Sequence, residues 1–114
     1  MKKEWIYKTE SVLCRDALRL EEIHLNGLGR EGWEVCTHEY SRWSSRKTYV
    51  FRKDRNDKKE WEYKFDVVTI TDDRHLEYYL DQLGCAEWQV VAHRHYAFSN
   101  IRTYIFMRER AKTL

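Results

Sequence analysis

The sequence has no proline, only four glycines and only three cysteines among its 114 residues. Without proline, no position is barred from a helix or a strand ladder, so regular elements with short turns are expected. The cysteines Cys14, Cys36 and Cys85 are odd in number, widely spaced and free of any Cys-x-x-Cys pair. They argue against a disulfide scaffold and against a structural zinc site, and we expect reduced thiols.

Long apolar runs and a charge of one sign are also missing. No stretch approaches the roughly 18 apolar residues of a membrane span, and the first residues lack the apolar core of a signal peptide. We therefore predict a cytoplasmic protein with no membrane partner. The formal net charge is +2, from 21 basic and 19 acidic side chains, so a nucleic-acid partner would need a local basic patch.

The usual patterns of catalysis are absent too. Four glycines form no phosphate-binding loop, no Gly-x-Ser-x-Gly elbow occurs, and no cysteine has an obvious base beside it. We therefore expect neither an enzyme nor a bound cofactor.

What is present is an internal repeat. Residues 28–35, Leu-Gly-Arg-Glu-Gly-Trp-Glu-Val, return at 83–90 as Leu-Gly-Cys-Ala-Glu-Trp-Gln-Val, and the sequence Lys-Glu-Trp-x-Tyr-Lys occurs at 3–8 and at 59–64. A unit of roughly 55 residues buries too little surface to be comfortable alone. We therefore expect two copies that share one core.

Each copy reads as strand, helix, strand, strand. Alternating apolar residues at 61–67 predict a half-buried strand, and Leu76, Tyr79, Leu80 and Leu83 share one face of a helix whose N-cap is Asp72 or Asp73. Gly29 and Gly84 follow the two helical runs, and we interpret each as a left-handed residue that closes its helix. Strands are then expected from Trp33 and Trp88, with the histidines on the strand faces opposite Val35 and Val90.

The prediction is an α+β fold of two β-α-β-β repeats paired by pseudo-twofold symmetry, with about six antiparallel strands and two helices. The first repeat covers residues 1–53, a polar linker 54–58 and the second repeat 59–114. We expect Trp5, Trp33, Trp61 and Trp88 in the core. The third strands are apolar on both faces, so either the sheets pack together or the chain self-associates or binds a protein partner.

The Trp-x-Tyr-Lys strand, the leucine-rich helix ending in Leu-Gly-x-x-Gly-Trp-Glu-Val and the Thr-Tyr-Val-Phe-Arg strand together resemble the domain-of-unknown-function 4177 family. The resemblance covers residues 3–53 and 59–110 as a tandem pair. The second copy departs from the pattern at Glu87, in place of the second glycine, and at Gln89. The resemblance implies this fold and a bacterial or phage origin, and it brings no catalytic residues.

Three histidines are the only candidates for a metal site. His38 and His93 occupy equivalent positions in the two copies, and His95 lies two residues beyond His93 on the same strand face. No pair of carboxylates accompanies them, so we expect no metal, and a His-based metal enzyme is the least favoured alternative.

The hairpin tips are the most suggestive candidates for binding. Arginine and tryptophan together can stack on a flat ring and neutralise an anion. The predicted contact residues are Arg42, Trp43, Arg46 and Lys47 at the first tip and Phe98 and Arg102 at the second. The sequence thus favours a non-catalytic binding or regulatory module that recognises a protein or a small anionic ligand through these tips and the groove between the repeats. A single-stranded nucleic-acid binder is the alternative.

Overall fold

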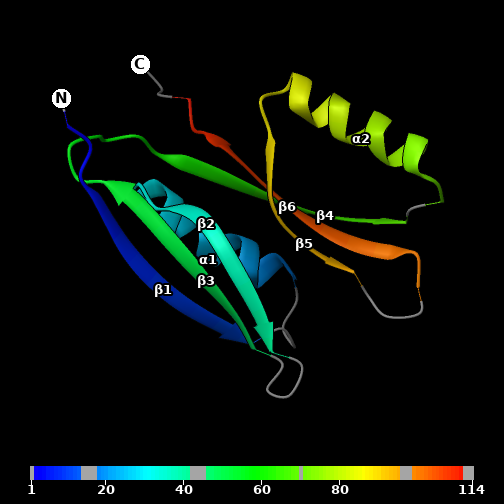
Figure 1. The fold of residues 1–114 in the computed structure, drawn as a ribbon, viewed down its shortest axis with the longest axis horizontal. Coiled ribbons are helices and arrows are strands. Elements are labelled where there is room, and N and C mark those ends of the chain that lie inside the picture. The colour runs from blue at the N-terminus through cyan, green and yellow to red at the C-terminus, as the bar shows by residue number, and fades with distance from the viewer. Residues whose placement is uncertain (1, 14–17, 42–45, 70, 96–98, 112–114) are drawn as a thin grey trace.

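The computed structural model describes residues 2–13, 18–41, 46–69, 71–95 and 99–111 (Figure 1). The first repeat contains β1 (Trp5–Leu13), α1 (Leu18–Arg30), β2 (Glu34–Ser41) and β3 (Arg46–Asp54). The second contains β4 (Trp61–Thr69), α2 (Asp73–Cys85), β5 (Gln89–His95) and β6 (Ile101–Glu109). The predicted α+β fold with two similar β-α-β-β units is therefore confirmed, and the connection between the units is short.

The six strands form two antiparallel sheets. The first sheet has the order β1-β3-β2 and the second the order β4-β6-β5, so each third strand is central and each first strand lies at an edge. The registers match between copies, since Tyr7 pairs with Arg52 as Tyr63 pairs with Met107. An irregularity follows Val35 in β2 and recurs after Val90 in β5. The duplication thus extends from the sequence to the details of strand pairing.

That irregularity corrects the predicted strand faces. Val35 pairs with Phe51 of β3, and because of the extra residue His38 pairs with Tyr49, two positions from Phe51. Residues two apart on a strand share a face, so His38 and Val35 lie on the same face of the sheet. The same holds for His93 and Val90 in the second copy. Simple alternation placed these histidines on the opposite face, because a bulge of one residue cannot be recognised from period-two patterning.

The predicted start of α2 is confirmed, but the predicted helix C-termini are wrong. Asp72 is the N-cap of α2, and its carboxylate accepts from the His75 amide at 2.7 Å. Gly29, however, lies inside α1, and the left-handed residue is Gly32, with φ of 96°. The amide of Trp33 donates to the Leu28 carbonyl at 3.1 Å and that of Gly32 to the Gly29 carbonyl at 3.0 Å. These two hydrogen bonds form a Schellman motif, and the residues joined by its outer bond, Leu28 and Trp33, are the ones that recur as Leu83 and Trp88.

The second copy closes α2 in the same way but with glutamate at the left-handed position. Glu87 has φ of 69°, which a residue with a Cβ adopts at a cost of about 1 kcal/mol. We predict that Glu87→Gly raises the free energy of unfolding by about that amount in urea denaturation. Gly32→Ala, at the equivalent position, should have the opposite effect, and equal effects of both changes would contradict this assignment.

In the described part of the chain, two contacts between elements do most to join the repeats. The equivalent edge strands β2 and β5 approach each other, as a twofold relation between the repeats requires. The helices depart from that symmetry, because α1 packs against β4 whereas α2 makes no comparable contact with β1 in the described part of the chain. Figure 1 shows α1 behind the first sheet and beside β4, and α2 at the far end of the second sheet, well away from β1.

The α1–β4 contact covers an exposed sheet edge with polar side chains. The side-chain amide of Asn26 donates to the carbonyl of Tyr63 at 3.1 Å, and its oxygen accepts from the amide of the same residue at 2.7 Å. The carboxylate of Glu22 accepts from the Phe65 amide at 2.8 Å. The helix therefore satisfies the outward backbone groups of β4 as a neighbouring strand would.

The core lies between the two sheets, beside α1. Its largest fully buried side chains are those of Tyr49, Phe51, Leu25 and Ile105, while Phe106 is buried on the other face of β6, against Tyr79 of α2. The prediction of four core tryptophans holds only in part: Trp33 and Trp61 are half-buried and pack against the core, Trp88 is half-buried outside that cluster, and Trp5 is exposed. Both faces of β6 are buried within one chain, from Thr103 to Met107, so packing inside the molecule accounts for the apolar character of this strand.

Candidate functional site

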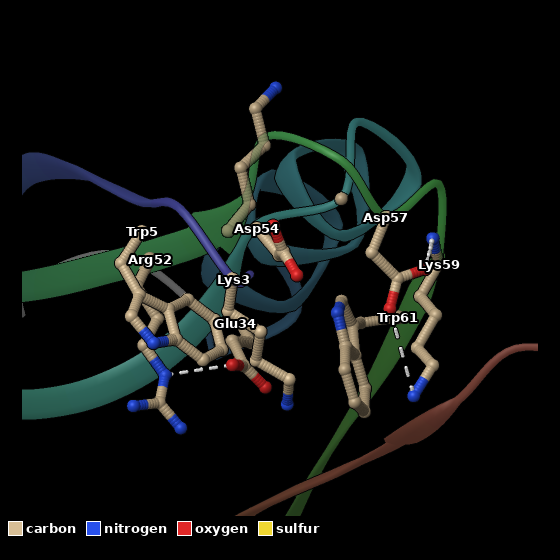
Figure 2. Close-up of a pocket in the computed structure, with 10 residues that line it drawn as sticks. Lys3, Trp5, Glu34, Arg52, Asp54, Asp57, Lys59 and Trp61 are labelled. Atoms are coloured by element: carbon tan, nitrogen blue, oxygen red, sulfur yellow. Dashed lines mark hydrogen bonds and ion pairs between the residues drawn. The ribbon is translucent and has the colours of Figure 1, made fainter. Parts of the chain in front are cut away.

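A groove opens where the two repeats meet, and we call it the inter-repeat groove. It encloses about 200 Å³ and is lined by Trp5 and Trp61, which are equivalent residues of the two copies. Figure 2 shows their indoles on either side of the groove, with Lys3 and Glu34 drawn between them. Two flat aromatic surfaces thus line one small open site.

Two features of the first repeat set the position of Trp61. The amide and carbonyl of the nearby Tyr63 are held by Asn26, and the absence of a side chain at Gly29 lets the Trp61 carbonyl approach α1. Trp5 begins β1, and its ring lies under the guanidinium of Arg52, 4.2 Å from the ring centroid. The backbone of Trp61 is therefore positioned by α1, and the Trp5 ring is held by the side chain of Arg52.

Four cations and three carboxylates line the same groove, and most of these charges pair with one another. The guanidinium of Arg52 lies 2.8 Å from the carboxylate of Glu34, and the ammonium of Lys59 lies 3.8 Å from that of Asp57. The third carboxylate, Asp54, accepts from the backbone amides of residues 4 and 56.

Two lysines keep an uncompensated charge among the described residues. The ammonium of Lys3 lies over the Trp5 ring, 5.4 Å from its centroid, and that of Lys53 lies over Trp33 at 4.5 Å and donates to the Glu31 carbonyl. The ammonium of Lys53 thus lies toward Trp33 and Glu31, which do not line the groove, and Lys3 supplies the one ammonium of the described lining that has no carboxylate partner and is not directed away from it. Two stacking surfaces beside this cation suit a flat, negatively charged molecule.

The predicted hairpin contacts are only partly described. Arg42, Trp43 and Phe98 lie outside the described residues. Arg46 is exposed at the start of β3 and Arg102 is half-buried near the start of β6. These two residues lie on different sheets. Since the tips themselves lie outside the described residues, a binding site formed by them stays a prediction.

Lys47 does not fit its predicted role at a binding tip. Its side chain is buried, with the ammonium 3.9 Å from the carboxylate of Glu21 and 4.9 Å from the ring centroid of Tyr49. Simple alternation along β3 explains this position, since Lys47 shares a face with the buried Tyr49. A lysine held in this way supports the packing of α1 on the sheet.

The histidines come together in part. His38 and His93 contact the equivalent tyrosines: the His38 ring lies tilted against Tyr49 with centroids 6.4 Å apart, and the His93 ring stacks on Tyr104 with centroids 6.0 Å apart. Burial lowers the pKa of His38 below its ordinary value, and the charges of Lys47 and His93 lower it further. The side chain of His95 is outside the described part, and among the described residues no three histidine, cysteine or acidic side chains gather to hold a metal ion.

The lowered pKa of His38 predicts a loss of stability in acid. The unfolded chain binds a proton at about the ordinary pKa of 6.5, whereas the folded chain resists protonation until a lower pH. The contribution of His38 is therefore complete above pH 6.5 and is lost as the pH falls through the lowered pKa. Urea denaturation of His38→Gln should show a weaker dependence on pH than the wild type, and His75→Gln, which changes an exposed histidine on α2, should leave it unchanged.

The comparisons with known proteins give no relative: no family model, no curated protein and no solved structure matches the chain. The resemblance to the 4177 family stays a prediction. In the described ranges, no helix has the length and apolar character needed to cross a membrane.

Sequence reasoning missed the main residues of the inter-repeat groove. Trp5 and Trp61 were assigned to the core, and Lys3 and Lys53 were not considered. One signal could have pointed to them, because the repeated Lys-Glu-Trp places a lysine two residues before each tryptophan. That spacing puts the cation and the indole on the same side of an extended chain.

Proposed function

We propose that this protein is a non-catalytic binding module whose ligand is a small anion with one flat ring, held in the inter-repeat groove. The single observation that supports this best is the placement of two indoles, Trp5 and Trp61, beside the ammonium of Lys3, which has no carboxylate partner among the described residues. A ring would stack on the tryptophans while the acidic group lies near Lys3. The volume of about 200 Å³ favours a ligand smaller than the drug-sized molecules that fill pockets of roughly 300–1,000 Å³.

Titration calorimetry can test this with uridine monophosphate, uridine and inorganic phosphate as probes. If the ring and the charge are both recognised, the monophosphate should bind more tightly than either of its parts. Trp5→Ala should weaken its binding by about tenfold or more, the equivalent of about 1.4 kcal/mol. Because Trp5 is exposed, this change should leave the fold intact.

Two controls separate the groove from the general surface. Tyr78→Ala removes an exposed aromatic ring from α2, and Arg74→Ala removes an exposed cation from the same helix. Neither should alter binding, whereas Lys3→Ala should weaken it and reduce its dependence on salt. Equal binding by wild type and Trp5→Ala would exclude the groove as the site, and no binding of any probe would exclude this ligand class.

A further inference from the structure

Each repeat carries the same kind of surface for docking a strand, but only the surface of the first repeat is used within one molecule. Within one molecule, α1 and the start of β2 receive β4, while α2 and the start of β5 carry equivalent groups and receive no strand in the described part of the chain. We propose that a second copy of this protein fills that surface. In this assembly β1 of one molecule docks on α2 and β5 of another, and repeats between molecules the contact that β4 makes within one.

The helix glycines give the first argument. A Cβ at Gly29 would lie 2.2 Å from the carbonyl oxygen of Trp61, so only glycine lets β4 approach α1. A Cβ at the equivalent Gly84 would meet nothing within 4 Å. Glycine weakens a helix relative to alanine, so Gly84 has a cost and no steric purpose inside this molecule. A strand docked from a second copy, with Trp5 in the place of Trp61, supplies that purpose.

The equivalent tyrosines give the second argument. The hydroxyl of Tyr63 accepts from the Val35 amide at 3.0 Å and donates to the Trp33 carbonyl at 2.9 Å, and its side chain is 3% exposed. Tyr7 is 63% exposed and makes no such contact with the described residues of its own molecule. Val90, the equivalent of Val35, is 45% exposed although its neighbours in the sheet match. The pocket for Tyr7 of a second copy thus lies open at the start of β5.

The polar groups repeat as well. Glu77 and Asp81 are exposed on α2 at the positions of Glu22 and Asn26, the residues that hold the edge of β4. The register of β1 turns the amides of Tyr7 and Thr9 away from β3, as those of Tyr63 and Phe65 turn away from β6. Two carboxylates would therefore accept from two outward amides of the docked strand. Asp81 repeats only the accepting half of the Asn26 contact, since it has no donor for the Tyr7 carbonyl.

Charge favours the same pairing. The cap and body of α2 include four acidic residues, Asp72, Asp73, Glu77 and Asp81, against one exposed cation, Arg74. The segment that would dock carries lysines at positions 2, 3 and 8 against Glu4 and Glu10, so its net charge is positive by one. The two surfaces attract each other, and added salt should weaken the association.

The contact between molecules should be weaker than the one inside the chain. The face of the first sheet that would dock presents Thr9 and Arg52, where the second sheet presents Phe65 and Met107. Less apolar area is therefore removed from water. We expect reversible association that depends on protein concentration, in contrast to an obligate assembly.

Sedimentation equilibrium of three proteins tests the proposal. The apparent mass of the wild type should rise with concentration. Gly84→Ala places a methyl group where the docked backbone must lie, and should raise the dissociation constant by at least about tenfold. Gly27→Ala changes an exposed helix glycine that also has open space around it, but on α1, and should associate as the wild type does. Both alanine variants should remain folded, because alanine suits a helix better than glycine.

Hydrogen exchange locates the contact. As the wild-type concentration rises, exchange at the amides of Tyr7 and Thr9 should slow, and in Gly84→Ala it should stay fast. A wild type that stays monomeric up to about 1 mM, a concentration that would reveal even weak binding, would overturn the proposal. So would a Gly84→Ala protein that associates as strongly as the wild type, or association without protection of these two amides.

Discussion

Replacing Gly29 with alanine should lower the free energy of unfolding by about 3 kcal/mol or more. The added Cβ would lie 2.2 Å from the carbonyl oxygen of Trp61, 2.9 Å from its carbonyl carbon and 3.1 Å from the ring of Tyr63. Two of these atoms are backbone, so β4 itself must move away from α1. Overpacking costs about 1–3 kcal/mol, and each hydrogen bond that is lost adds about 1 kcal/mol. Urea denaturation at low protein concentration measures the change.

The other helix glycines provide matched controls for this prediction. Gly27 and Gly84 also lie within helices, and a Cβ at either position meets nothing within 4 Å. Alanine at each should therefore raise the stability of the monomer by up to about 1 kcal/mol. If Gly29→Ala proved as stable as these variants, the close approach of Trp61 to α1 would be incorrect.

The order of helices and strands could be predicted from the sequence because both copies of the repeat show the same pattern. The α2 start at Asp72, the alternation in β4 and the pairing of two small units all follow from local chemistry and size. The helix ends were harder. Gly29 was chosen as the left-handed residue because it directly follows the apolar helix pattern, whereas the Schellman closure places that residue one position before Trp33. Glutamate at position 87 concealed the same closure in the second copy.

The burial of equivalent residues could not be predicted, because identical motifs have different surroundings. Tyr7 and Tyr63 both stand in Lys-Glu-Trp-x-Tyr-Lys, yet only Tyr63 is covered by a helix of the other repeat. The motif records which side chains can pack, and the contact between the repeats decides which of them do. Trp5 and Trp61 differ for the same reason, and Trp5 remains exposed.

The candidate site depends on that same contact. The inter-repeat groove joins the start of β1 to the start of β4, and these segments are brought together only when α1 receives the second repeat. Residues on a single hairpin, such as Arg46 and Lys47, could be recognised as neighbours from the sequence. Whether their side chains are exposed could not be recognised, since the burial of Lys47 follows from its position beside Tyr49 beneath α1.

Tyr63 links the two repeats more closely than any other described side chain of β4. Its ring belongs to the core cluster that also contains Leu25 and Leu28 of α1, and its hydroxyl binds the backbone of Trp33 and Val35. Burial raises the pKa of this hydroxyl well above its ordinary value, so it remains a neutral donor at all physiological pH values. A side chain that both fills the core and satisfies two backbone groups should be costly to remove.

Tyr63→Ala should therefore lower the free energy of unfolding by about 3–5 kcal/mol, through the cavity left in the core and the unpaired Val35 amide. Tyr63→Phe keeps the ring and loses only the hydrogen bonds of the hydroxyl, so the free energy of unfolding should fall by about 1–3 kcal/mol. Tyr7→Ala removes the same side chain from the first copy, where it is exposed, and should change the stability of the dilute monomer by about 0.5 kcal/mol or less. Urea denaturation of the three variants compares them directly. Similar losses from Tyr7→Ala and Tyr63→Ala would mean that the repeats join symmetrically, with α2 covering β1 as α1 covers β4.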